Sequence, residues 1–158
     1  MVSGLAGGLA ATFVMSQFQT ASKHWRNHHH RGAQSHPPQE QEPATVQTVQ
    51  AVSQAATGHE LARQQKAKAG QAVHYAFGAA SGMVYGARAE YRRRARAGRG
   101  AAFGTGLWAL AHEFAVPALK LSKSPLQEDA SAHLYGLASH VVYGVTADAV
   151  SRGVRALL

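Results

Sequence analysis

The chain has 158 residues, 46% of them apolar, and it carries 16 Lys+Arg against 8 Asp+Glu with no cysteine. This length suits one domain of ordinary size and excludes a large multi-domain enzyme. The lack of cysteine excludes a disulfide scaffold, a Cys-ligated zinc or iron–sulfur site and a thiol nucleophile. Alanine and glycine are abundant, and the charged residues gather in a few blocks with long uncharged segments between them.

Four segments carry almost no charge: residues 1–22, 69–87, 100–119 and 130–147, of which the third contains only Glu113. Each is close to the roughly 20 residues with which a helix crosses the hydrocarbon core of a bilayer. A bundle of Ala-rich helices in water, the alternative, should show a polar stripe every 3.6 residues. Residues 77–87 and 100–110 have no such stripe. The sequence therefore predicts an all-α integral membrane bundle of four helices.

The predicted organisation has three parts. Residues 1–22 form the first transmembrane helix, read as a retained anchor because it lacks the basic start of a signal peptide. Residues 23–68 form a His/Gln-rich extra-cytoplasmic loop, irregular around Pro37, Pro38 and Pro43 and with a short surface helix from residue 44 onward. Residues 69–158 hold three further transmembrane helices.

Arginines set the predicted orientation. The short loop at 88–99 is strongly basic, and short basic loops stay on the cytoplasmic side of a membrane. With four spans, both termini then lie in the cytoplasm. Within this loop Arg92, Arg93, Arg94 and Arg96 are expected to contact lipid and fix the topology. No aromatic stacking surface accompanies them, so we expect no nucleic acid as partner.

An internal repeat relates the second and fourth segments. Residues 78–90 (GAASGMVYGARAE) and 136–148 (GLASHVVYGVTAD) are identical at seven of thirteen positions. The first and third segments share less, chiefly Gly-Leu at 8–9 and 106–107. This predicts two tandem helical hairpins. Glycines spaced four apart make a smooth helix face for close packing, and the predicted packing glycines are Gly78, Gly82, Gly86, Gly136 and Gly144.

Three stretches of the chain resemble a known family. They are HYAFGAASGMVYG, then FGTGLWALAHEFAVPALKLS, then HLYGLASHVVYG. The pattern is similar to the YagU-like family of small bacterial inner-membrane proteins of unknown function, over about residues 70–150. The resemblance implies multi-span membrane topology, localisation in the bacterial cytoplasmic (inner) membrane and no established activity. The His- and Gln-rich segment at 24–65 departs from it.

Ionisable side chains within the predicted spans are candidates for function, because charge is costly at membrane depth. They form the candidate intramembrane polar cluster: His74, His112, Glu113, His133 and His140. The cluster could relay protons, ligate a haem or chlorin through one neutral imidazole, or hold a metal through two or three side chains. Our preferred interpretation is that these groups hydrogen-bond between helices. We assign no catalytic residue and no metal site.

The sequence thus predicts a membrane protein of structural or accessory type and not an enzyme. Its expected partners are membrane lipids and either other membrane subunits or further copies of itself. The first alternative is a small transporter or proton-conducting protein that uses the His/Glu cluster, and the second is haem or chlorin ligation. A third class, a basic nucleic-acid binder, requires that the chain be extracted without detergent. The sequence identifies no cofactor.

Overall fold

The computed structural model describes residues 1–29, 44–91, 98–111 and 130–157. Within these ranges the chain is all α, as predicted, and contains five helices and no strand: α1 (Val2–His29), α2 (Ala44–Thr57), α3 (Arg63–Tyr91), α4 (Ala101–Trp108) and α6 (Ala130–Leu157). A short π-helical turn over 109–111 follows α4. Among the described residues, no helix has both the length and the apolar character by which a membrane span is recognised.

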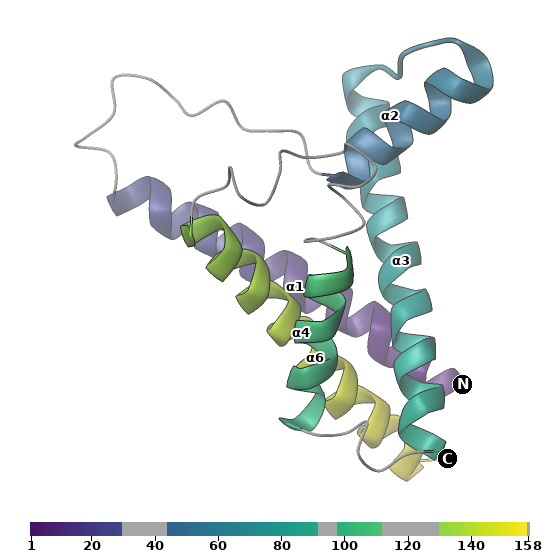
Figure 1. Cartoon of the computed structure of the whole chain (residues 1–158), viewed down its shortest axis with the longest axis vertical. Coiled ribbons are helices and arrows are strands. Elements are labelled where there is room, and N and C mark those ends of the chain that lie inside the picture. The colour runs from purple at the N-terminus through teal and green to yellow at the C-terminus, as the bar shows by residue number, and fades with distance from the viewer. Residues whose placement is uncertain (30–43, 92–97, 112–129, 158) are drawn as a thin grey trace.

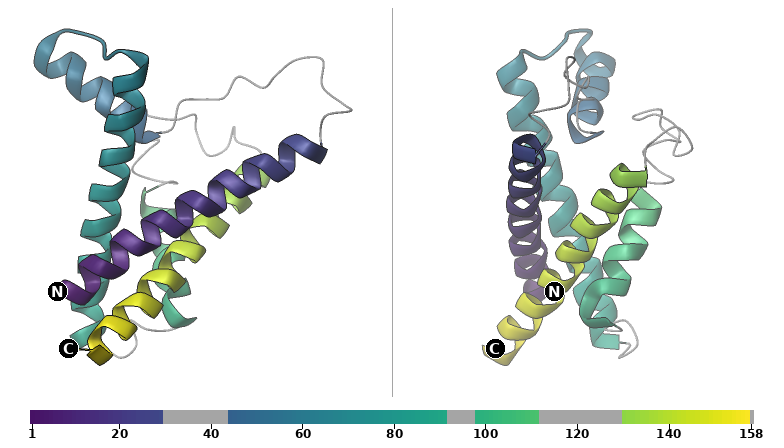
Figure 2. Two further views of the ribbon diagram at one scale, coloured as in Figure 1. Left: turned by 180° about the vertical axis from the view of Figure 1, so that it is seen from behind. Right: turned by 90° about the vertical axis from the view of Figure 1, so that its left-hand side faces the viewer.

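Three long helices form the frame of the molecule. Helices α1 and α6 run antiparallel and pack along each other, while α3 meets them at the end that holds both termini and diverges from α1 toward the other end (Figures 1 and 2). Helix α4 packs against α6, and α2 packs against α3. The N-terminal side of α1 and the C-terminal sides of α3 and α6 therefore share one end of the molecule.

Two helices extend into the segment predicted as a loop. Helix α1 continues past Ser22 to His29, and α3 begins at Arg63, ahead of the uncharged run that starts at residue 69. The reason is local: residues 19–29 contain neither glycine nor proline, and residues 63–69 (RQQKAKA) are strong helix formers. Helix α2 lies where a short helix was predicted, and its Val46 packs against Gly70 of α3.

A left-handed turn leads into α4. Gly98, Arg99 and Gly100 all have positive φ, at 62°, 51° and 86°. Gly100 also lies directly against the carbonyl of Gly144 on α6, so a side chain there would be excluded by both conformation and space. This turn brings the start of α4 onto the C-terminal half of α6.

Candidate functional site

Apart from Met15 and two tyrosines, the described side chains that the helices bury are small or polar, whereas many large apolar side chains are exposed. On α1 the buried face consists of Ser3, Gly4, Gly7, Gly8, Ala11, Thr12 and Met15. The opposite face presents Leu5, Leu9 and Phe13, and Phe13 is 54% exposed. This distribution is the reverse of the usual one, in which large apolar residues fill the interior. It means that the helices are joined by close backbone contact and by hydrogen bonds.

The first of two glycine crossings joins α1 to α3. A Cβ placed on Gly4 would lie 2.6 Å from the carbonyl oxygen of Gly82 and 3.1 Å from the Cα of Gly86. A Cβ placed on Gly8 would lie 2.5 Å from the carbonyl oxygen of Gly78. These distances leave no room for any side chain. The four-residue spacing of glycines on both helices is therefore what lets the two backbones touch.

The second crossing joins α4 to α6 in the same way. Gly104 of α4 lies against the backbone of His140 and Val141, and Gly144 of α6 lies against the backbone of Gly100 and Gly104. In the repeat, His140, Val141 and Gly144 correspond to Gly82, Met83 and Gly86, which are the residues that Gly4 contacts. By these contacts, Gly104 of α4 is the structural equivalent of Gly4 of α1. The Gly-Leu match at 8–9 and 106–107 would instead align Gly4 with Ala102. That sequence alignment therefore does not reproduce the contacts at the two crossings.

Two tyrosines at the same position of the repeat lie at the centre of the packing. Tyr85 is 1% exposed and Tyr143 is 2% exposed. The Tyr143 hydroxyl donates a hydrogen bond to the carbonyl oxygen of Gly78, at 2.5 Å. The Tyr85 hydroxyl donates to Oδ1 of Asp148, at 2.7 Å, and its ring lies 4.8 Å from the ring of Phe103 on α4. Both hydroxyls therefore connect α3 with α6.

The buried carboxylate of Asp148 has a second partner. Its Oδ2 lies 3.0 Å from Nη2 of Arg152, one turn further along α6, whereas its side chain is only 2% exposed. A buried charge is tolerated where it is both paired and hydrogen-bonded. The sequence repeat makes Tyr85 and Tyr143 equivalent packing residues and places Asp148 near the end of a span, but it does not show that Tyr85 meets Asp148. The signal for them was the repeat itself, because both copies carry the tyrosine and both end in an acid.

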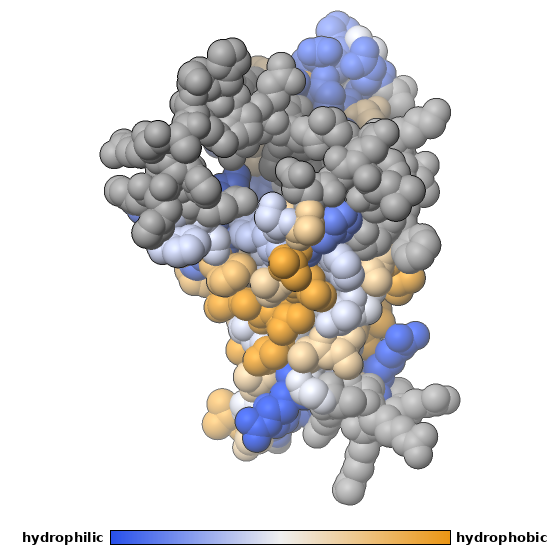
Figure 3. All heavy atoms as spheres, turned by 60° about the vertical axis from the view of Figure 1, so that its left-hand side comes forward, coloured by the Kyte–Doolittle hydropathy of each residue, from blue (hydrophilic) through white to orange (hydrophobic). Residues whose placement is uncertain are grey.

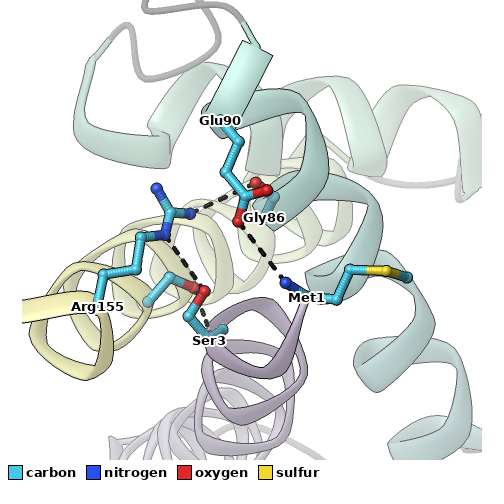
Figure 4. Close-up of polar contacts among 6 residues, drawn as sticks. Met1, Ser3, Gly86, Glu90 and Arg155 are labelled. Carbon is cyan, nitrogen blue, oxygen red and sulfur yellow. Dashed lines mark hydrogen bonds and ion pairs between the residues drawn. The ribbon is translucent and has the colours of Figure 1, made fainter. Parts of the chain in front are cut away.

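A group of polar contacts joins three helices at the end that holds the termini (Figure 4). Nε of Arg155 donates to Oγ of Ser3 at 3.2 Å, and its Nη2 donates to the carbonyl oxygen of Gly86 at 3.4 Å. Ser151 donates from Oγ to the carbonyl oxygen of Ser3 at 3.0 Å. The amino nitrogen of Met1 lies 3.6 Å from Oε1 of Glu90. Arg155 thus ties α6 to α1 and α3 at once.

The predicted histidine cluster is described only in part, since His112 and Glu113 lie outside the described residues. His74 is half-buried on α3, with its ring edge-on to that of Tyr75. On α6, Nδ1 of His140 lies 2.8 Å from the carbonyl oxygen of Gly136. His133 lies edge-on to Trp108 at 6.4 Å between ring centres. Across the described ranges, no three His, Asp or Glu side chains are grouped so as to hold a metal ion.

Of the other predicted site residues, some lie within the described ranges and some lie outside them. The five glycines predicted to pack the helices, Gly78, Gly82, Gly86, Gly136 and Gly144, are all buried. The arginines predicted to contact lipid, Arg92, Arg93, Arg94 and Arg96, lie outside the described residues. The nearest described arginines on either side, Arg88 and Arg99, are exposed.

Residues 27–149 match the family described as a protein of unknown function, DUF1440. The chain belongs to the DUF1440 family. The matched region includes α2, α3 and α4 and most of α6, and therefore both repeat copies and the Tyr85–Asp148 pair. No curated protein and no solved structure was found to match this DUF1440 chain. The YagU-like name inferred from the sequence stays a prediction.

Proposed function

We propose that this DUF1440 protein is an integral protein of the bacterial inner membrane, built as a bundle of closely packed helices. It has a structural or accessory role and no enzymatic activity. Its architecture is that of two tandem helical hairpins, one centred on the α1–α3 crossing and one on the α4–α6 crossing. The observation that carries the proposal is the reversed burial of the helices, with small and polar side chains inside and large apolar side chains outside. Such a surface is costly in water and favourable in hydrocarbon.

Helix α3 has a suitable surface for this environment. Phe77 and Val84 are 49% and 51% exposed, and they lie on one face because they are seven residues apart. Between Lys68 and Arg88 the helix carries no Asp, Glu, Lys or Arg. At 1.5 Å per residue these two cations are about 30 Å apart, which is the thickness of a hydrocarbon core.

Helices α1 and α6 repeat the pattern. Leu5, Leu9 and Phe13 follow one another at intervals of one turn along the exposed face of α1. On α6, Leu134 and Val145 are exposed on a shared face. Figure 3 shows hydrophobic residues gathered across the middle of one side of the molecule, with hydrophilic residues toward both ends. An apolar band between two polar ends is the arrangement that a bilayer favours.

The direction of the chain supports the proposed topology. Both termini lie at one end of the molecule, together with the C-terminal end of α3 and the start of α4 (Figure 1). The segment that joins α3 to α4 contains the arginine run 92–96. If this end faces the cytoplasm, the basic connection obeys the positive-inside rule and both termini are cytoplasmic.

The polar groups inside the bundle support a structural role. Tyr85, Tyr143 and Ser151 each donate a hydrogen bond to a neighbouring helix. Polar side chains used in this way fix which helix faces meet. Proton conduction and haem ligation stay predictions from the sequence, since both depend in part on His112 and Glu113. The accessory role implies a partner subunit that is a different membrane protein.

Two measurements test the proposal. Membranes that contain the chain are washed with alkaline carbonate, and single cysteines at Leu157 and Glu60 are labelled with a maleimide that cannot cross the bilayer. The natural chain has no cysteine to interfere. We expect the chain to stay in the membrane and the two positions to label from opposite sides. Release by carbonate, or labelling of both positions from one side in sealed vesicles, would contradict the proposal.

The accessory role needs its own experiment. The chain is purified in mild detergent from its native membranes, and the intact particle is analysed by mass spectrometry and absorption spectroscopy. A stoichiometric complex with other membrane proteins is the expected result. A small colourless oligomer of this chain alone would contradict an accessory role and favour transport.

A further inference from the structure

Two segments of the sequence that border the end of the molecule holding the termini are rich in arginine. From residue 84 to 100 and from 145 to 157 the sequence has eight arginines and two acidic residues, a net charge of +6. The rest of the chain has eight basic and six acidic residues, a net charge of only +2. Most of the chain's net charge of +8 therefore belongs to these two segments of the sequence. We call the three described arginines Arg88, Arg99 and Arg152 the arginine end.

Three contacts place the arginine end together. Arg88 follows Gly86 by two residues, and the carbonyl of Gly86 is bonded to Arg155 of α6. Arg99 precedes Gly100, which lies against Gly144 and Asp148 of α6. Arg152 is one turn beyond Asp148. The three side chains come from α3, the turn before α4, and α6, and all three residues are exposed.

The acidic residues at this end are already engaged. Asp148 is buried between Tyr85 and Arg152, so its charge is balanced inside the bundle. Glu90 lies beside the amino group of Met1. Neither carboxylate lies within ion-pair distance of Arg88 or Arg99 among the described contacts. An external anion is the natural complement of these two arginines.

The neighbours of these arginines indicate what kind of anion it is. Arg88 lies one turn beyond the exposed Val84 on the same face of α3, and Arg152 lies two turns beyond the exposed Val145 on the same face of α6. A cation directly next to an exposed apolar side chain matches a molecule with a phosphate and an acyl chain. Nucleic acid offers phosphates without acyl chains and is recognised through base stacking or groove contacts.

From this arrangement we infer that the arginine end binds the headgroups of anionic phospholipids and so selects them from the surrounding bilayer. This inference rests on the proposed membrane function. Arg155 is not part of the surface, because it bonds Ser3 and Gly86 and holds the helices together. Each arginine near an anionic membrane surface strengthens binding about fivefold.

The test compares two double variants of the full chain purified in detergent. Arg88→Gln with Arg99→Gln removes two charges from the arginine end and leaves the Asp148–Arg152 pair intact. Lys66→Gln with Lys68→Gln removes two charges from the opposite end of α3. Each protein is given equal amounts of phosphatidylglycerol and phosphatidylcholine, and native mass spectrometry measures the ratio in which the two lipids are retained.

The expected ratio favours phosphatidylglycerol for the unmodified chain and for the lysine variant, and falls by about fivefold per arginine in the arginine variant. An equal fall in the lysine variant, or no preference in any protein, would overturn the inference. So would binding to duplex DNA in preference to lipid. The carbonate wash separates the two proposals: a chain that stays in the membrane but shows no preference retains the proposed function alone.

Discussion

The hydroxyl of Tyr85 lies 2.7 Å from Oδ1 of Asp148, although 63 residues separate the two in sequence. The bond runs from α3 to α6, and thus from one copy of the repeat to the end of the other. In the second copy the equivalent Tyr143 donates to the carbonyl of Gly78. The two copies are therefore joined by a reciprocal pair of tyrosine hydrogen bonds whose acceptors differ: one is a carboxylate and the other a backbone carbonyl.

The Tyr85 bond should contribute measurably to stability. Tyr85→Phe removes the donor and leaves Oδ1 of a buried carboxylate without it. Hydrogen bonds to charged groups contribute about 1.5–3 kcal/mol, so we expect a loss of that size in the free energy of unfolding. Tyr75→Phe, a half-buried position on the same helix, is the control and should change it by less than about 0.5 kcal/mol. Thermal unfolding in detergent measures both, and equal effects of the two variants would contradict this role for Asp148.

Alanine at the glycine crossings should be destabilising although alanine is the better helix former. In Gly82→Ala the new methyl group meets the backbone of Gly4 and Gly8, and overpacking of this kind costs about 1–3 kcal/mol. Gly104→Ala should behave alike, because its methyl would meet the backbone of His140 and Val141.

Gly106→Ala is the matched control for this pair. Gly106 lies in the same helix as Gly104, and a Cβ there has no atom within 4 Å. We expect a gain of up to about 1 kcal/mol, the difference in helix propensity between alanine and glycine. Stabilisation by all three substitutions in thermal unfolding would mean that the crossings are not in contact.

The antiparallel pairing of α1 and α6 can be tested by cross-linking. Oγ of Ser151 donates to the carbonyl oxygen of Ser3 at 3.0 Å, so the two residues lie close together. Ser3→Cys with Ser151→Cys should form a disulfide under mild oxidation, visible as a mobility shift that reductant reverses. Phe18→Cys with Ser151→Cys should not, because Phe18 stacks on Tyr135 at the other end of α6. The opposite outcome would exclude this pairing.

An arginine placed on the exposed face of α3 tests whether that face contacts lipid or water. Phe77 is half-exposed, so in water Phe77→Arg should change stability by less than about 0.5 kcal/mol. Near the centre of a bilayer an arginine costs about 2.5–3.5 kcal/mol, which should reduce the inserted fraction clearly. Ala67→Arg, an exposed site on the same helix outside the uncharged run, is the control. Equal insertion of both variants would count against a lipid-facing Phe77.

The sequence was sufficient for the all-α class, for the approximate positions of the helices and for the clustering of charge along the chain. Long segments without proline or charge predict helices from local preference alone, and the position of α2 followed from the good helix formers after Pro43. The repeat of 78–90 in 136–148 also predicted that both copies do related work, and the tyrosines and glycines that it singled out are buried in both. These properties depend on neighbours in sequence, so no fold is needed to infer them.

The tertiary structure decided which faces meet. Helices built largely of alanine and glycine have no strong apolar stripe to mark the buried side, so the pairing of Gly4 with Gly82 and Gly86, and of Gly104 with His140 and Val141, could not be inferred from composition. The same holds for Asp148, which a sequence reading places at the end of a span and the fold buries at 2% exposure against Tyr85. Close backbone packing requires that the surfaces of two helices match in shape. This match is determined only when both helices are placed in the tertiary structure.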